Sequence, residues 1–403
     1  MSNIEKWEKN EEIAIFREYL RIPTVQPDID YTECVAFLRR QAASLDLPVE
    51  VVHPVVPSKP VVVMKWMGSE PALPALLLNS HMDVVPVYPE RWTNPPFSAH
   101  LAEDGRIYAR GAQDMKCVAM QYLGAIRALK ASGYQPRRTV FLSFVPDEEI
   151  GGAHGMKDYV NTKHFKDLNI GFALDEGMAD EGEIYSVFYA ERTLWHLKLN
   201  ISGAAGHGLM LLPNTAGEKL NYVTQKLMQF RAGERQRLLA GGKSLGDVTT
   251  VNLTVLRGGV QTNVLPSLIE ATFDIRFSLD VDMEAFEQQL RDWCEEAGGG
   301  IEVEFVVKNP RFGATAIDDS NPYWLSFKSA LEQFGERLQT LVLPGATDVR
   351  YVRNAGIPAL GFSPIKHTPR TLHDDNEWLH ADTYLHGIEV YKRLIPALAD
   401  TQA

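Results

Sequence analysis

The chain has 403 residues, and 45% of them are hydrophobic, which is enough apolar material for two or three domains with large cores. Its formal net charge of -12 argues against nucleic acid and anionic membrane surfaces as partners. The sequence has no apolar run of about 18 residues that could span a membrane, and its first residues lack the apolar stretch of a signal peptide. Without a signal peptide or a membrane span, the protein is expected to be cytoplasmic, and its three widely spaced cysteines, which lack metal-ligand spacing, are expected to be reduced core residues.

Three short apolar runs in the first half of the chain each lead into histidine or carboxylate side chains. These are 76–78 before Ser80-His81-Met82-Asp83, 140–142 before Asp147-Glu148-Glu149, and 170–174 before Asp175-Glu176. Continuous apolar runs are typical of parallel strands that are buried on both faces. Because such sheets bind ligands beyond the carboxyl ends of their strands, we expect the three clusters to converge on one site.

Two more candidate ligands lie outside these runs, Asp114 after Gln113 and His373 near the C-terminus. Histidines and carboxylates without cysteine suit Zn²⁺ or a similar divalent ion, and a pair of ions needs about five or six protein ligands with one carboxylate bridging. Any single cluster would more simply be a surface hydrogen-bonded pair or a solvated loop. The full set predicts a two-metal hydrolase.

The chain between these clusters fits an α/β domain. Apolar residues recur at helical spacing from Cys117 to Lys130, and Gly133 ends the predicted helix. Buried strands that alternate with helices in this way predict a mostly parallel sheet flanked by helices.

The pattern changes near Glu191, where a second domain is expected to begin. Apolar and polar residues alternate strictly over 195–201 and again over 269–277. Strict alternation is typical of antiparallel strands with one exposed face.

Two amphipathic helices complete this second domain. The first begins at Thr215, which forms a capping box with Glu218, and the second includes 286–293 and ends at three glycines. With a last strand at 301–307, the order strand, helix, strand, strand, helix, strand predicts a ferredoxin-like α+β unit with a sheet face or edge free for a partner. The expected domain bounds are residues 1–189 with 308–403 for a discontinuous catalytic domain and 190–307 for the insert.

Four segments carry a longer pattern than the ligand clusters alone. They are Ser80-His81-Met82-Asp83-Val84-Val85-Pro86, Tyr108-Ala109-Arg110-Gly111-Ala112-Gln113-Asp114-Met115-Lys116, Asp147-Glu148-Glu149-Ile150-Gly151-Gly152 and Leu174-Asp175-Glu176-Gly177. In this order they resemble the signatures of the di-zinc aminoacylase, carboxypeptidase and dipeptidase family. The resemblance runs from about Phe16 to about Leu398 without large gaps. It implies a zinc-exopeptidase-like catalytic domain and an inserted lid or dimerisation domain.

The resemblance also implies two zinc ions in each subunit. His81 and Glu176 would bind one ion, Glu149 and His373 would bind the other, and Asp114 would bridge them.

Two further carboxylates, those of Asp83 and Glu148, are expected to assist the metal ligands. Asp83 is suited to accept the proton on the free imidazole nitrogen of His81, although it could also be a simple loop cap. Glu148 is the candidate general base that takes a proton from the zinc-bound water. Its alternatives are a third metal ligand or an exposed carboxylate.

The inserted domain would contribute groups that bind the substrate. By resemblance, His207 is donated across a homodimer interface to the partner's site, where it stabilises the oxyanion, and Asn263 lies with it among the candidate substrate groups. The guanidinium fork of Arg276 could pair bidentately with a substrate carboxylate. The simpler alternatives are that His207 is an ordinary loop histidine and that Arg276 is an ordinary exposed arginine of a strand, with no part in substrate binding.

Two positions depart from the family pattern. Residues 208–212 are Gly-Leu-Met-Leu-Leu, where members commonly have a small residue and serine, and Val349 stands where a polar residue is usual. An apolar loop beside His207 would enlarge the acyl pocket, so the departures bear on substrate preference and not on reaction class. Gly345 and Thr347 remain candidates for hydrogen bonds to the substrate.

The chain is therefore expected to be a zinc-dependent amidohydrolase that cleaves N-acyl-L-amino acids into a carboxylate and a free L-amino acid. The acyl group is left open, and cobalt or manganese could replace zinc. A dipeptidase or carboxypeptidase of the same family would share the metal chemistry and differ in its specificity pockets. A catalytically silent binding protein with the same fold is the third possibility, and the intact ligand set argues against it.

Overall fold

The computed structural model describes residues 3–402, which fold into two compact units. Unit 1 comprises the chain up to Tyr189, Gly313–Thr340 and the chain from Thr347 onward, and unit 2 comprises Ala190–Phe312 and Leu341–Ala346. Unit 2 therefore runs five residues beyond the insert that the sequence suggested. It also takes in a short segment that the sequence argument had placed in the catalytic domain.

Unit 1 is built on an eight-stranded sheet. In spatial order the strands are β1 (Val49–Val52), β2 (Val61–Trp66), β6 (Val140–Val145), β3 (Ala75–His81), β7 (Ile170–Asp175), β16 (Ala359–Gly361), β8 (Ile184–Glu191) and β15 (Arg337–Leu343). The central strands β6, β3, β7 and β16 are parallel, and β2 and β8 flank them antiparallel. The prediction of a mostly parallel sheet is confirmed for the centre, where the three predicted apolar runs became β3, β6 and β7.

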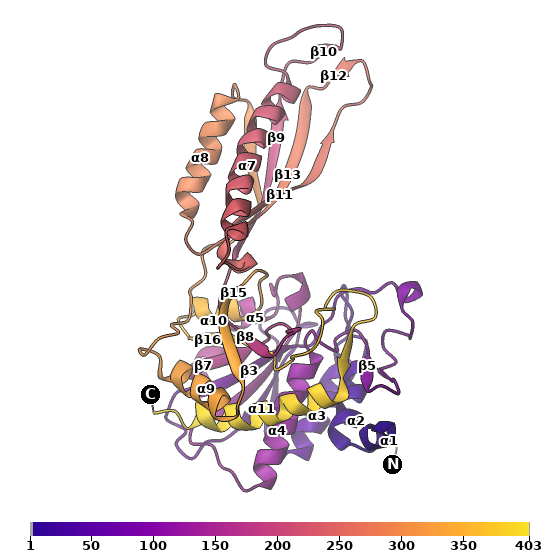
Figure 1. Ribbon diagram of the computed structural model, residues 1–403, viewed down its shortest axis with the longest axis vertical. Coiled ribbons are helices and arrows are strands. Elements are labelled where there is room, and N and C mark those ends of the chain that lie inside the picture. The colour runs from indigo at the N-terminus through magenta and orange to yellow at the C-terminus, as the bar shows by residue number, and fades with distance from the viewer. Residues whose placement is uncertain (1–2, 403) are drawn as a thin grey trace. The chain divides into compact units, whose positions relative to one another are not determined.

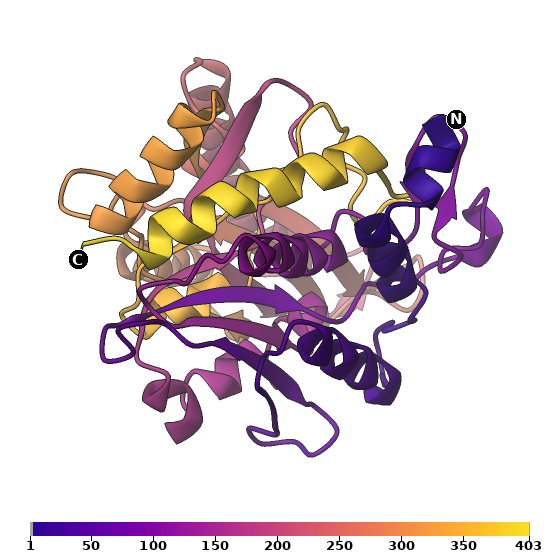
Figure 2. The same cartoon turned by 90° about the horizontal axis from the view of Figure 1, so that it is seen from below.

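Helices cover both faces of this sheet. One face carries α2 (Glu11–Leu20), α3 (Thr32–Ser44), α4 (Lys116–Ala131), α9 (Pro322–Gln333) and α11 (Ala381–Ala399), and the short α1 (Asn3–Glu8) packs on α2. The other carries α5 (Met156–Tyr159), α6 (Lys163–Asp167) and α10 (Val349–Asn354). Figure 2 shows α11 lying along α4 on the first face. Because both faces are buried, alternate residues of β3 enter different cores: Leu76 and Leu78 face α4, and Leu77 faces α5.

A small sheet of β17 (Trp378–His380), β5 (Arg106–Tyr108) and β4 (His100–Leu101) completes unit 1, with short 3-10 turns η1 (Pro89–Arg91) and η2 (Glu148–Ile150). All three cysteines are buried and free. Within residues 3–402, no helix is long and apolar enough to cross a membrane.

Unit 2 has the expected strand and helix order. Its sheet runs β11 (Thr250–Gly258), β13 (Leu268–Phe277), β9 (Thr193–Ser202), β14 (Ile301–Lys308), and all three pairings are antiparallel. Two helices, α7 (Ala216–Leu239) and α8 (Met283–Glu296), lie side by side over one face (Figure 1). The predicted capping box of Thr215 and Glu218 is confirmed at the start of α7. The order of these strands is that of a ferredoxin-like unit.

A short ribbon lies at the end of the unit 2 sheet where β9 ends and β13 begins. β10 (Gly206–His207) pairs with β12 (Val264–Leu265), which places the residues after β9 beside those before β13. A further 3-10 turn, η3 (Leu245–Asp247), precedes β11. The sheet's uncovered face and its two edge strands, β11 and β14, are thus the surfaces that unit 2 leaves unpaired among the described residues.

Candidate metal and active site

Six candidate residues of unit 1 lie at one edge of the central sheet. His81 is the last residue of β3, Glu176 directly follows β7, and Glu148 and Glu149 lie in η2, just beyond β6. Because β6, β3 and β7 are adjacent parallel strands, their carboxyl ends bring these side chains together. Asp114, from the loop before α4, and His373, from the loop between β16 and β17, complete the set.

Asp114 lies between two histidines. Its Oδ1 is 3.0 Å from His81 Nε2, and its Oδ2 is 3.2 Å from His373 Nε2. The same His81 nitrogen is 3.6 Å from Glu176 Oε1, and the same His373 nitrogen is 3.0 Å from Glu149 Oε2. The side chains therefore form two ligand pairs with one carboxylate between them, the arrangement that a bridged pair of ions needs.

A second grouping involves Glu148. Ligand atoms of His81, Glu148 and Glu176 lie within 4.8 Å of one another, as do those of His81, Asp114 and Glu149. Glu148 is therefore close enough to one ligand pair to act on a group held there. The geometry alone also admits it as a ligand.

The ionisation of these groups fits divalent cations. Burial, reinforced by the charge of Asp114, raises the pKa of Glu149 to about 7 and also raises that of Glu176 well above its usual value. Burial raises the pKa of Asp114 as well, but hydrogen bonds with His373 and His81 outweigh it and hold this pKa well below its usual value. Glu149 Oε1 is buried and has no hydrogen-bond partner among the described residues. Crowded, buried carboxylates are costly without a cation among them, so the donor set suits Zn²⁺ or a similar ion.

His81 is held with its Nε2 free for a metal. Its Nδ1 lies 2.9 Å from the backbone carbonyl oxygen of Asp83, which can only accept, so Nδ1 carries the proton. The Asp83 carboxylate is 3.6 Å away from that nitrogen. This differs from the sequence expectation, because the carboxylate is used elsewhere: it accepts the N–H groups of Glu148 at 3.2 Å and Glu149 at 3.1 Å. Asp83 thus orients His81 through its backbone and η2 through its side chain.

Sequence reasoning missed Glu377 and the role of Gln113. The buried Glu377 carboxylate accepts the N–H groups of Gly111 at 3.0 Å and Gln113 at 2.6 Å, and Arg110 Nη1 donates to it at 2.9 Å. The Gln113 amide exchanges hydrogen bonds with the backbone N–H and the hydroxyl of Thr371. These contacts tie the loop of Asp114 to the loop of His373. A single sequence has no signal that pairs residues more than 250 positions apart.

The candidate substrate groups of unit 2 lie on separate parts of it. His207 Nδ1 accepts the backbone N–H of Leu209 at 3.2 Å, which leaves Nε2 as a hydrogen-bond donor. Asn263 lies next to it, since its carbonyl oxygen accepts the N–H of Gly208 at 2.7 Å. Arg276 is paired with Asp274, with its Nε 3.1 Å from Oδ1.

His207 and Arg276 are far apart within unit 2. The His207 ribbon follows the Ser202 end of β9, which pairs with Leu268, whereas Arg276 pairs with Leu194 at the opposite end. Arg276 lies eight positions after Leu268 on β13, and the two positions are therefore about 26 Å apart along the strand at ~3.3 Å per residue. Of the remaining candidates, Gly345 belongs to unit 2, and the buried Thr347 belongs to unit 1.

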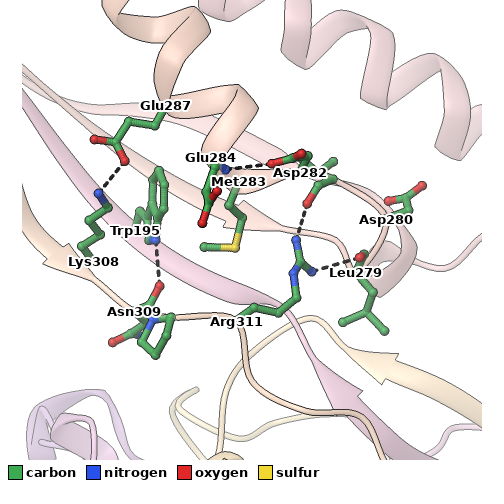
Figure 3. Close-up of a pocket in the computed structure, with 12 residues that line it drawn as sticks. Trp195, Leu279, Asp280, Asp282, Met283, Glu284, Glu287, Lys308, Asn309 and Arg311 are labelled. Carbon is green, nitrogen blue, oxygen red and sulfur yellow. Dashed lines mark hydrogen bonds and ion pairs between the residues drawn. The ribbon is translucent and has the colours of Figure 1, made fainter.

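A pocket of about 720 Å³ in unit 2 is unrelated to these residues. Figure 3 shows that its polar groups are used by their neighbours: Trp195 Nε1 donates to the carbonyl oxygen of Asn309 at 2.9 Å, and Lys308 pairs with Glu287. The Arg311 guanidinium donates to three backbone carbonyl oxygens. We assign no chemistry to this pocket, because its groups satisfy one another and none of its pairs resembles a catalytic arrangement.

Comparison with known proteins points to one family. The pattern of peptidase family M20/M25/M40 matches residues 77–397. Aminoacylase-1 of Sus scrofa is 47% identical over 97% of this chain and 96% of its own length, and aminoacylase-1 of Homo sapiens is 46% identical over 98% and 97%. The solved structure of an M20 family metallo-carboxypeptidase from Sulfolobus solfataricus has a TM-score of 0.73 at 20% identity, with 97% of this chain and 100% of that chain covered. At that identity the likeness supports the fold alone.

Proposed function

The chain belongs to peptidase family M20/M25/M40, and on this premise we propose that it hydrolyses N-acyl-L-amino acids to a carboxylate and a free L-amino acid. The observation that carries the proposal is the identity of 46–47% to aminoacylase-1 over nearly the whole length of both chains. The side chains beyond β6, β3 and β7 support it, because His81 belongs to two groups of candidate ligands, one with Asp114 and Glu149 and one with Glu148 and Glu176, and His373 reaches the first of them.

We propose zinc as the metal, with two ions in each subunit. His81 and Glu176 would hold one ion, Glu149 and His373 the other, and Asp114 would bridge them, in keeping with the two ligand pairs on either side of Asp114. Bound zinc supplies Lewis acidity, which polarises the scissile carbonyl and makes a water molecule acidic near neutral pH.

Glu148 would act as the general base and then as the general acid. It is buried beside His81 and Glu176, and its backbone is held by Asp83. As the water oxygen bonds to the carbonyl carbon, a Glu148 carboxylate oxygen accepts a proton from that water. When the C–N bond breaks, the same oxygen returns the proton to the leaving amine nitrogen, so the carboxylate is regenerated.

The substrate would be held at its two ends by groups of unit 2. The Nε2–H of His207 would donate to the carbonyl oxygen as negative charge develops there. Arg276 would pair with the free carboxylate of the amino acid, exchanging its present partner Asp274 for the substrate.

We infer that one copy of the chain does not supply both groups to one substrate. Arg276 lies about 26 Å along β13, at ~3.3 Å per residue, from Leu268, the end of the strand that adjoins the His207 ribbon, whereas an N-acyl amino acid spans about two residues of extended chain, or ~7 Å. We therefore propose a homodimer in which His207 of one subunit serves the site of the other.

The edge strand β11 is the surface we propose for this dimer. Leu253, Val255 and Leu256 on it are exposed by 38–55%, and a long apolar edge strand is a ready partner for a second strand. The opposite edge strand, β14, exposes Glu302 and Glu304 beside a single apolar residue, Val306, and charged side chains on an edge strand discourage pairing. Pairing of β11 with its own copy would bury the apolar edge around a two-fold axis.

Two substrates offered in parallel separate the candidate functions. We expect the zinc-loaded protein to hydrolyse N-acetyl-L-methionine much faster than a neutral dipeptide, and chelation to abolish the activity. Faster cleavage of the dipeptide would favour the dipeptidase or carboxypeptidase alternative, and binding of zinc without turnover of either would favour a silent binding protein. A cytoplasmic location stays a prediction from the sequence.

A further inference from the structure

The turn that carries Glu148 and Glu149 is anchored by the residue before them. Asp147 has a left-handed backbone, with φ of 64°, and its carbonyl oxygen accepts the N–H of Gly152 at 2.7 Å. Its side chain is only 1% exposed, so the carboxylate must be stabilised within the protein. The neighbours of Asp147 therefore decide how firmly this turn is held.

Three donors converge on one oxygen of Asp147. Lys59 Nζ is 2.7 Å from Oδ1, Gln26 Nε2 is 3.0 Å from it, and the hydroxyl of Tyr31 is 3.4 Å from it. Lys59 brings the positive charge, and its ammonium also lies 5.8 Å from the centre of the Tyr31 ring. Its side chain is 16% exposed, so water screens this ion pair less than it would a surface pair.

Lys59 reaches the turn from a distant part of unit 1. It lies in the loop 53–60 between β1 and β2, and among the described residues its ammonium contacts Asp147 and Tyr31 rather than a candidate ligand or Glu148. Nothing in the proposed chemistry requires a lysine there.

A second set of hydrogen bonds connects Asp147 to the backbone of Glu148, the proposed general base. The same Gln26 nitrogen that donates to Asp147 also donates to Asp83 Oδ2 at 2.8 Å. The Asp83 carboxylate in turn accepts the N–H groups of both Glu148 and Glu149. The turn is therefore held at its start by Asp147 and along its backbone by Asp83, and Gln26 joins the two carboxylates.

We propose that Lys59 is a positioning residue for catalysis, because its ion pair with Asp147 fixes the turn that aims the Glu148 carboxylate. The inference rests on the proposed function, in which Glu148 moves the proton. It assigns to Lys59 no contact with substrate or metal. The expected signature is slower chemistry with substrate affinity and metal content preserved.

Replacement of the lysine tests this directly. We expect Lys59→Met to lower kcat for N-acetyl-L-methionine by roughly 10- to 100-fold, since small misplacements of a catalytic group have effects of this size. KM should stay within about threefold, because the binding groups are elsewhere. Lys59→Arg keeps the charge and should recover most of the lost kcat. Zinc content should match the wild type in both variants, and both should be folded at the assay temperature, although Lys59→Met should have a lower thermal midpoint because Asp147 loses its counter-charge.

Lys65→Met is the matched control. Lys65 lies on β2 opposite Phe141, at the end of β6 away from the Asp147 turn, and its ammonium is likewise 5.8 Å from the centre of an aromatic ring, that of Phe141. This variant should keep the wild-type kcat.

Four results would overturn the inference while leaving the proposed function intact: an unchanged kcat in Lys59→Met, an equal loss in Lys59→Arg, an equal loss in Lys65→Met, or a loss of activity that zinc loss or unfolding at the assay temperature fully accounts for. A wild-type protein that binds zinc and hydrolyses neither N-acyl amino acid nor dipeptide would instead overturn the proposed function, and this inference with it.

Discussion

Two consecutive glutamates at the centre of the site face different neighbours. Glu149 Oε2 is 3.0 Å from His373, whereas Glu148 groups with His81 and Glu176. The 3-10 turn η2 explains this, because successive side chains of such a turn point about 120° apart. One residue can therefore hold a metal while the next moves a proton.

Glu148→Gln and Glu149→Gln should separate these roles. We expect Glu148→Gln to keep both zinc ions and to lose roughly two to four orders of magnitude in kcat, the usual range for general-base catalysis. Glu149→Gln should lose zinc as well as activity, because a neutral amide is a poorer ligand. Metal analysis alongside kinetics decides between them, and zinc loss in Glu148→Gln with retention in Glu149→Gln would reverse the assignment.

Arg276 is a second residue whose chemistry can be isolated. Its guanidinium can form two parallel hydrogen bonds to a carboxylate, and a charge-assisted contact of this kind contributes about 1.5–3 kcal/mol. Arg276→Lys keeps the charge and removes the fork, so kcat/KM for N-acyl amino acids should fall at least about tenfold. The corresponding amino acid amides have no carboxylate and should be indifferent to the change; equal losses for both substrates would exclude the carboxylate contact.

At the scale of elements, the two edges of the unit 2 sheet are unequal. β11 exposes three apolar side chains, Leu253, Val255 and Leu256, whereas β14 exposes two carboxylates and one apolar side chain, Val306. If β11 forms the dimer interface, Leu253→Lys combined with Leu256→Lys should weaken the free energy of dimer association by about 2 kcal/mol or more, because two charges would be buried at the interface without partners. We expect this variant to be monomeric by light scattering and to lose most activity.

Val306→Lys on β14 is the matched control for the β11 variant. Val306 is also exposed and also lies on an edge strand, so the control makes the same kind of substitution at the opposite edge, with one added charge in place of two. The control should stay dimeric and active. Dissociation of the control, or an intact dimer in the β11 variant, would place the interface elsewhere.

The local sequence pattern correctly predicted the central strands and the start of α7, because a short stretch of sequence is enough to specify each of them. The runs before His81, Glu148 and Asp175 became adjacent parallel strands because each is apolar on both faces. The capping box of Thr215 and Glu218 formed because its two residues are three apart. Such signals lie within a few residues of the structure they produce.

The contacts that the sequence did not reveal are long-range or involve the backbone. Glu377 accepts N–H groups from the Asp114 loop, and neither partner has a pattern that identifies the other. The bond from His81 to Asp83 uses a carbonyl oxygen, which every residue has. Leu341–Ala346 joins unit 2 through contacts such as Arg192 with the Pro344 carbonyl oxygen, far away in sequence. Side-chain chemistry is readable from one sequence, whereas loop docking is not.

In the whole molecule, the proposed active site needs residues from two copies of the chain. Unit 1 holds the metal ligands and Glu148, and unit 2 holds His207 and Arg276 at opposite ends of its sheet. A site that needs Glu148 of one subunit and His207 of the other occurs twice in a symmetric dimer. Two defects in different chains can then leave one site intact.

Activity after subunit exchange tests this claim most directly. Glu148→Gln and His207→Asn should each be nearly inactive alone. Mixed in equal parts and allowed to exchange subunits, they should recover up to about a quarter of wild-type activity, because about half of the dimers are mixed and each has one intact site of two. No recovery despite demonstrated exchange, or full wild-type activity from a monomer, would contradict the composite site and leave His207 acting within its own chain or not in catalysis at all.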